Sequence, residues 1–168
     1  MLFKLGSAQF DQTVRAYSAD LYRYAWWLVR DRFTAEELVQ ETFARAWKNW
    51  DSLEDFGAVK SWLIAILRNE RARLYERKRL DIGDDDPQDL ELPSGERPGA
   101  QLELEQLMEQ LPISYREPLA LQVLGGYDCR EIAAMLGTSE GAVMTRLTRA
   151  RQALRAHLSE PAKARVTP

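Results

Sequence analysis

Arginine and hydroxyl side chains near the C-terminus are the residues whose types and spacing best fit a chemical task. At helical spacing they face outward together between residues 139 and 155. Guanidinium groups suit phosphates and guanine edges, and hydroxyls suit bases or phosphates. The outward set is Ser139, Glu140, Met144, Thr145, Thr148 and Arg149, with Arg146, Arg151 and Arg155 alongside. This pattern predicts binding to DNA, and the alternative is a helical hairpin with a solvated basic face.

The elements that must position this set read as a helix-turn-helix. Asp128 and Glu131 have the spacing of a capping box that opens a short helix. Gly137 stands where a left-handed helix end is needed, and Ser139 can cap the next helix. The apolar side of that second helix is expected to be Val143, Leu147, Ala150 and Leu154. In such a motif the second helix enters the major groove of DNA.

A second basic cluster ends a helix predicted from about residue 60 to residue 79. The basic residues are Arg68, Arg71, Arg73, Arg77, Lys78 and Arg79, against Glu70 and Glu76. Its apolar anchors are Trp62, Leu63, Ile66, Leu67 and Leu74. Such an excess of positive charge would neutralise phosphates and make binding to DNA depend on salt. Because these side chains point in several directions around the helix, not all of them can contact one strand.

Catalytic and metal-binding constellations are not expected. The sole histidine, His157, has no nucleophile or ligand cluster spaced around it. The acidic run at residues 84–86 has neither the alternation nor the glycine of a calcium loop. Cys129 is the only cysteine, which excludes an internal disulfide, and it is interpreted as a packed side chain rather than a redox sensor. We therefore predict a protein that is not an enzyme and needs no cofactor or metal.

The N-terminal half is predicted to be a compact helical bundle. A long amphipathic helix has its apolar stripe at Phe10, Val14, Tyr17, Leu21, Ala25 and Leu28. A capping box with Thr34 at the N-cap and Glu37 three residues later predicts the start of a second helix. The apolar side of that helix is expected to be Val39, Phe43, Ala46, Trp47 and Trp50. The opposite, polar side presents Glu37, Gln40, Glu41, Ala44, Arg45 and Lys48.

The charge distribution divides the chain into three parts. The net charge of the 168 residues is −3, but residues 81–110 hold ten acidic residues and one arginine, between two mildly basic parts. Residues 81–99 are also rich in proline and glycine, which predicts an extended linker. We expect an all-α chain with an N-terminal bundle at 1–80, a flexible acidic linker at 81–99, a C-terminal helix-turn-helix domain at 100–160 and a tail at 161–168. No apolar run approaches membrane-spanning length, so a cytoplasmic protein without a membrane span is expected.

Several motifs in order resemble an extracytoplasmic-function (group 4) sigma factor of the sigma-70 family. Residues 35–47 resemble the signature of that family's region 2, and residues 62–69 resemble its next segment. The residues that fall in the places of region 4 are Leu111-Pro112, Arg116-Glu117, Glu131-Ile132-Ala133, Gly141, Val143, Arg146-Leu147 and Arg149-Ala150-Arg151. The resemblance covers about residues 8–80 and 100–158. It implies region 2 and region 4 domains joined by a flexible linker.

The resemblance also implies partners and site residues. Core RNA polymerase would be bound through the clamp of its largest subunit by Glu37, Gln40, Glu41, Ala44, Arg45 and Lys48, and region 4 would use a second surface of polymerase. The promoter −10 element would be read and melted by Asn49, Asp51, Phe56, Arg68, Asn69, Arg71, Arg73, Arg77 and Lys78. The −35 element would be read by Ser139, Met144, Thr145, Arg146, Thr148 and Arg149. An anti-sigma factor is an expected further partner.

Departures from the family pattern leave alternatives open. Glu37 and Arg73 stand where the family commonly has Asp, and Met144-Thr145 replace a frequent Lys-Ser. Phe56 could form the wall of a pocket for an unpaired base, or it could be tucked into the core. The acidic linker could mimic nucleic acid or be only a spacer. The alternatives for the whole chain are a sigma mimic that sequesters an anti-sigma factor and a free-standing helix-turn-helix repressor.

Overall fold

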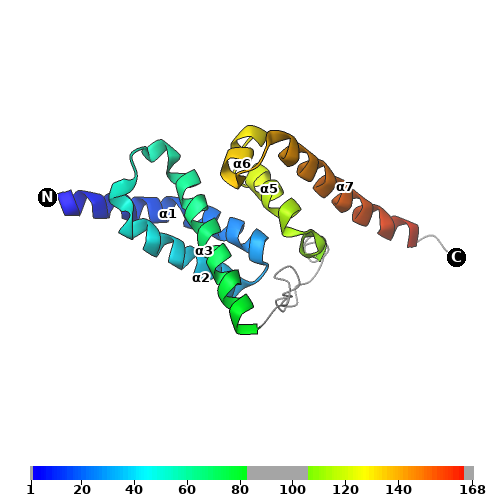
Figure 1. Cartoon of the computed structure of the whole chain (residues 1–168), viewed down its shortest axis with the longest axis horizontal. Helices are drawn as coiled ribbons and strands as arrows, with labels where there is room; N and C mark the ends of the chain where they lie inside the picture. Colours follow the sequence, from blue (N-terminus) through cyan, green and yellow to red (C-terminus); the bar gives the residue numbers. More distant parts are fainter. Residues whose placement is uncertain (1, 83–105, 165–168) are drawn as a thin grey trace. The chain divides into compact units, whose positions relative to one another are not determined.

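The structure is a computed structural model that describes residues 2–82 and 106–164, with side chains over residues 6–81 and 106–156. Within these ranges the chain is helical and has no strand. The contacts divide it into two compact units, Met1–Leu92 and Pro93–Pro168, which are drawn together in Figure 1 and are described separately. No helix within the described ranges combines the length and apolarity needed to span a membrane. The all-helical fold predicted from the sequence is confirmed.

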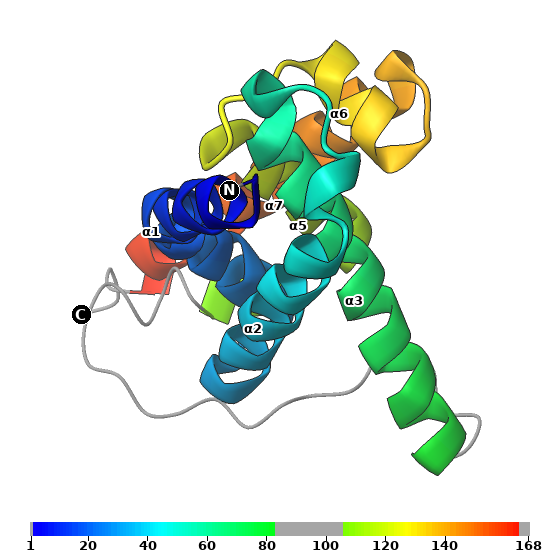
Figure 2. The same cartoon turned by 90° about the vertical axis from the view of Figure 1, so that its left-hand side faces the viewer.

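The first unit contains the long helices α1 (Leu2–Val29), α2 (Arg32–Lys48) and α3 (Val59–Ile82). Helix α2 packs against both α1 and α3, and the three helices lie side by side in Figure 2. The core is formed by side chains that are almost completely buried: Leu21, Leu28, Leu38, Leu63 and Leu67. These residues come from all three helices, so their burial fixes how the helices lie against one another.

The start of α2 differs from the capping box predicted at Thr34. The N-cap is Asp31, whose carboxylate accepts hydrogen bonds from the backbone N–H of Thr34 at 2.9 Å and from its hydroxyl at 2.6 Å. Thr34 is therefore a buried residue of the first turn, and the prediction of its cap role was wrong. The reason is that Arg30 ends α1 in a left-handed conformation (φ 55°), which leaves Asp31 as the residue before the new helix. Aspartate is also the more strongly preferred N-cap.

The buried side of α2 is rotated from the predicted aromatic stripe. Its buried residues are Thr34, Ala35, Leu38, Thr42 and Ala46. Trp47 is half-exposed, and Trp50 lies beyond the end of α2 in a short 3-10 turn. Small and medium side chains occupy the seam because α2 lies between two helices and must approach both. The larger aromatic residues are displaced to its edge.

The second unit contains a helical turn at residues 106–110 and the helices α5 (Ile113–Val123), α6 (Cys129–Leu136) and α7 (Glu140–Ala164). Helix α7 packs against α5 and α6. The buried side chains include Met108, Leu121, Ile132, Val143 and Leu147. This core lies on one side of α7 and leaves the other side of that helix exposed.

The turns of the second unit agree with the sequence predictions. Asp128 and Glu131 form a complete capping box at the start of α6, with both bonds at 2.8 Å. Gly137 ends α6 in the left-handed conformation (φ 62°), which glycine adopts without steric cost. The Ser139 hydroxyl accepts a hydrogen bond from the Ala142 backbone N–H at 3.1 Å and so caps α7.

The boundaries of the linker differ from the prediction. Helix α3 continues through Asp81 and Ile82, so the first two residues assigned to the linker are helical. The acidic side chain of Asp81 is exposed at the end of α3. The rest of the predicted linker, and the apolar positions Leu102 and Leu104, lie outside the described residues. At the other end, α7 extends to Ala164, into the predicted tail.

Candidate nucleic-acid interface

The outer face of α7 presents the residues that the sequence predicts for DNA contact. Val143, Leu147 and Ala150 are buried on the opposite side, so their burial sets the orientation of the helix. The exposed residues of the predicted set are Ser139, Met144, Thr145, Thr148 and Arg149, and Arg146 is half-buried. Met144 is 55% exposed, so its apolar side chain is part of this face. The structure thus brings five of the six residues to one surface of a rigid helix.

The hydroxyls on this face are oriented by the helix itself. The Thr145 hydroxyl donates to the Gly141 carbonyl at 3.0 Å, and the Thr148 hydroxyl donates to the Met144 carbonyl at 2.9 Å. With their protons used in this way, both oxygens present lone pairs outward and can accept from base amino groups. Arg151 instead bonds to Gln122 of α5. It therefore braces α7 against its neighbour, a role that the sequence did not reveal.

Some basic side chains of α3 contact other residues of the protein, which the sequence did not indicate. The Arg71 guanidinium lies over the Tyr75 ring, 4.5 Å from its centroid, and its Nε is buried without a hydrogen-bond partner. Arg73 Nη1 lies 3.1 Å from Glu70 Oε1. Asn69 is exposed, and Arg68 is half-buried. Two of the arginines predicted for the −10 element are therefore engaged within the protein.

Glu70 is the buried carboxylate that holds this region together. It is only 3% exposed, and it is bound by Arg45 of α2 as well as by Arg73 of α3. Arg45 and Arg73 are both about half-exposed, so their guanidinium groups cover Glu70 from the solvent side. From the sequence, Glu70 was predicted only as a charge that opposes the basic cluster. The spacing of three residues between Glu70 and Arg73 is a signal that the two can pair on one helix. Nothing in the sequence indicated the contact between Glu70 and Arg45 of α2.

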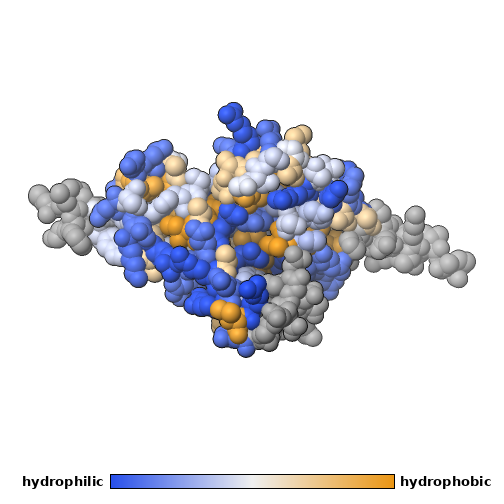
Figure 3. Space-filling view, in the orientation of Figure 1, coloured by the Kyte–Doolittle hydropathy of each residue, from blue (hydrophilic) through white to orange (hydrophobic). Residues whose placement is uncertain are grey.

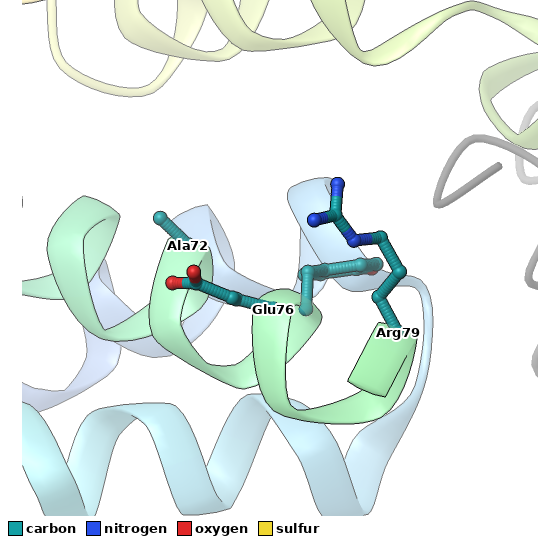
Figure 4. A pocket seen from close by; sticks show the side chains of 4 residues that line it. Ala72, Glu76 and Arg79 are labelled. Carbon is teal, nitrogen blue, oxygen red and sulfur yellow. The ribbon is translucent and has the colours of Figure 1, made fainter. Parts of the chain in front are cut away.

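The last turns of α3 carry the exposed part of the basic cluster. Arg77 and Arg79 are exposed and Lys78 is half-buried. The surface over this part of α3 is mostly hydrophilic in Figure 3. Figure 4 shows a pocket lined by Ala72, Tyr75, Glu76 and Arg79, with the labelled acidic and basic side chains extending from successive turns. Arg77 and Arg79 are thus exposed on this surface, as Arg73 is, but within the described residues they form no ion pair with Glu70.

The segment between α2 and α3 is two short 3-10 turns, η1 (Trp50–Ser52) and η2 (Phe56–Ala58). The Asn49 side-chain amide donates to the Arg45 carbonyl at 2.9 Å and closes the end of α2. Asp51 is exposed. Phe56 is half-exposed and packs at a steep angle against Trp50, with 5.6 Å between ring centroids. Phe56 is therefore only partly packed against the core, and the rest of its ring is exposed.

A cluster of aromatic side chains from α1, α2 and α3 packs against this segment. The buried Trp50 contacts Phe10 of α1 at 5.1 Å and Trp62 of α3 at 6.2 Å between centroids. Phe10 also packs against Trp47 at 4.9 Å. Aromatic rings have few rotatable bonds, so such a cluster fixes its members firmly. Phe10 therefore connects α1 to the turns that carry Phe56.

The polar face of α2 is exposed along its whole length. All six residues predicted for polymerase contact lie on the exposed surface: Glu37, Gln40, Glu41, Ala44, Arg45 and Lys48. Arg32 and Glu36 form an ion pair beside it at 3.0 Å, and the hydrogen bond to Glu36 raises the pKa of the Arg32 guanidinium. Phe33, which the sequence analysis missed, is the most exposed large apolar side chain of the described residues.

Comparison with protein-family models gives two matches on this chain. Residues 13–80 match sigma-70 region 2, and residues 101–154 match sigma-70 region 4. The ECF RNA polymerase sigma factor SigM of Bacillus subtilis is 33% identical over 153 residues, which are 87% of this chain and 93% of that protein. The ECF RNA polymerase sigma factor EcfG of Rhodopseudomonas palustris is 35% identical over 128 residues, which are 74% of this chain and 71% of that protein.

Two solved structures share the fold. The sigma factor RpoE from Bartonella quintana, crystallised with the anti-sigma factor NepR, is similar with a TM-score of 0.76 and 28% identity, over 89% of this chain and 96% of that chain. CnrH, solved with the cytosolic domain of CnrY, is similar with a TM-score of 0.67 and 26% identity, over 92% of this chain and 90% of that chain. The ordered matches to both regions and the identity to SigM agree with the geometry of α2, α3 and α7. The chain therefore belongs to the ECF sigma factors of the sigma-70 family.

Proposed function

We propose that this sigma factor binds core RNA polymerase through the exposed face of α2 and directs it to promoters with two separate DNA-reading helices. The observation that carries the proposal is the outer face of α7, where exposed hydroxyl, methionine and arginine side chains stand on a rigid, doubly packed helix. A protein that only sequestered an inhibitor would not need a preformed DNA-reading face. The proposed role is recognition and melting of promoter DNA, without catalysis by the chain itself.

At the −35 element, Arg149 is the proposed main contact. It is exposed at the C-terminal end of the predicted set, where a guanidinium can reach a guanine edge or a phosphate. Ser139 and Thr145 would contact the bases or backbone nearer the start of α7, and Arg146 and Thr148 would contact them farther along. Met144 would supply an apolar contact, for which a thymine methyl is the fitting partner.

At the −10 element, the proposed contacts come from the 3-10 turns and the exposed side of α3. Phe56 has its exposed side available to stack on an unpaired base. Asn49, Asp51 and Asn69 would bond to bases or sugars near it. Arg68, Arg77 and Lys78 would bind the phosphate backbone. Arg71 and Arg73 are proposed as supports of this surface, because both are engaged by neighbours.

We also propose a separate function for each part of the chain. Residues 1–80 would form the polymerase and −10 module, and residues 100–160 the −35 module. The acidic residues 81–99, most of which lie outside the described residues, would be a tether. Tethering raises the effective concentration of the second contact, so neither module needs high affinity alone. Binding to DNA and polymerase implies action in the cytoplasm.

An anti-sigma factor is proposed as the regulating partner. The structural similarity to RpoE, which was crystallised with the anti-sigma factor NepR, supports this proposal. Such a partner would cover the surfaces that polymerase and DNA require.

Reconstituted transcription tests the function directly. The purified full chain with core polymerase is expected to give promoter-dependent transcripts, and promoters are first obtained by selection with the reconstituted enzyme. Replacing Glu37 and Glu41 by lysine should strongly weaken binding to core polymerase. The control for a reversed surface charge is Asp11→Lys, because Asp11 is an exposed acidic residue of α1 and not of α2. A chain that binds core polymerase yet gives no transcripts, or never binds it, would contradict the proposal.

A further inference from the structure

Phe33 is exposed where an aromatic side chain is not expected. It is 81% exposed, in the first turn of α2. The position of the N-cap explains this exposure, because the cap at Asp31 makes Thr34 and Ala35 the buried residues of that turn. Phe33 is therefore directed away from the core of its unit. A single exposed apolar side chain is common on protein surfaces, so the position of Phe33 relative to its neighbours on α2 decides whether it has a role.

Phe33 lies on the same stripe as the proposed polymerase surface. Glu37, Gln40 and Ala44 follow it at spacings of four, seven and eleven residues, which place side chains on one side of a helix. All four residues are exposed. The six residues predicted from the sequence are therefore only the polar and small residues of this surface, which also contains the aromatic Phe33.

The composition of this stripe fits a protein partner. Interfaces gain most of their affinity from a few aromatic or arginine anchors that enter a pocket, and surrounding polar residues exclude water. Glu37 and Gln40 can form that polar surround, and small Ala44 permits close approach along the helix. A nucleic-acid partner fits poorly, because Glu37 and Glu41 would repel phosphates.

We propose that Phe33 is the apolar anchor of the α2 surface and inserts into an apolar pocket of core RNA polymerase. This inference rests on the proposed function, since it assigns polymerase to the α2 face. Continuity of Phe33 with the exposed acidic stripe argues for one shared partner. The pocket should be bordered by basic or amide groups that meet Glu37 and Gln40.

The test measures the affinity of the full chain for core polymerase by competition against a labelled wild-type chain. Phe33→Ser is expected to weaken binding at least about 10-fold, as the loss of an interface anchor does. Phe33→Leu should retain most of the affinity, because it keeps an apolar side chain. The control is Leu80→Ser, which removes a 74% exposed apolar residue from the far end of α3 and should leave affinity within about twofold.

The outcomes separate this inference from the proposed function. If Phe33→Ser binds like wild type while the Glu37 and Glu41 double replacement fails to bind, the anchor is wrong and the α2 surface stands. If neither set weakens binding, the surface itself is wrong. Loss of binding only to an anti-sigma factor would also overturn the anchor, because it would assign Phe33 to another partner. Unchanged thermal unfolding of Phe33→Ser checks that the exposed site contributes nothing to the fold.

Discussion

Helices α3 and α7 both carry rows of arginines, but the structure uses those rows differently. On α3, Arg71 is stacked on Tyr75, and Arg73 is paired with the buried Glu70. On α7, the braced residue is Arg151, and Arg149 has no ion pair within the described residues. The α3 row partly joins helices within the first unit, whereas the residues predicted for the −35 element on α7 lie mostly on its exposed surface. A count of basic residues therefore overestimates the number of side chains that α3 offers to a partner.

The largest effect is expected from the removal of both arginines that pair with Glu70. Replacing Arg45 and Arg73 by alanine takes both cations away from a carboxylate that is otherwise surrounded by the protein. We expect the first unit to lose about 3 kcal/mol of stability, since an uncompensated buried charge is costly. The measurement is urea unfolding of the full chain followed by tryptophan fluorescence. All five tryptophans lie between residues 26 and 62, so this signal reports on the first unit alone.

The control for that prediction is Glu70→Leu. Alone, it should change stability little, because the half-exposed arginines can turn to water and leucine fills an apolar site. Combined with the two alanine replacements, it should recover most of the lost stability. If the double alanine variant unfolds like wild type, Glu70 is not the element that makes the α3 row structural.

The second prediction tests the α7 row. Arg149→Ala should weaken binding of the reconstituted enzyme to a selected promoter by about 2 kcal/mol if the guanidinium reads a guanine. If it holds a phosphate, the loss should be similar for all sequences and the salt dependence should fall. Binding is measured by anisotropy at several salt concentrations. The control is Arg23→Ala, which removes the same charge from an exposed position of α1. Equal effects of the two variants would contradict a role of Arg149 in recognising the −35 sequence.

The smallest expected losses of stability come from removing one helix N-cap in each unit. Asp31→Ala and Asp128→Ala should each cost about 1 kcal/mol, because each removes the acceptor of a helix N-terminus. Tryptophan fluorescence reports the first loss, and amide hydrogen exchange within α6 reports the second. Thr34→Ser keeps the hydroxyl that bonds to Asp31 and should cost less than Asp31→Ala. A cost of Asp31→Ala no larger than that of Thr34→Ser would contradict the cap role of Asp31.

The second unit was predictable from sequence because its signals are local. The capping box at Asp128, the glycine at residue 137 and the cap at Ser139 each act within four residues. Local hydrogen bonds and backbone preferences need no tertiary information. The buried residues of α7 could be predicted from helical spacing for the same reason.

The first unit was predicted less completely because tertiary contacts decide its details. The burial of Glu70 depends on Arg45, which lies 25 residues earlier on another helix. The aromatic residues near Trp50 were assigned to one helix face, but packing against Phe10 and Trp62 places them at its edge and in the following turn. Phe33 was overlooked because the cap prediction began the helix three residues late.

The corner between α1 and α2 contains only Arg30 and Asp31. The left-handed Arg30 has its guanidinium over Trp26, at 4.8 Å from the ring centroid, so the corner is clamped by packing as well as by the cap. These contacts involve both residues of the junction, so the connection between the two helices is tight. Each residue inserted at the beginning of α2 would rotate the cap and α1 by about 100° relative to the rest of α2. The length of this junction therefore determines that the exposed stripe of α2 points outward.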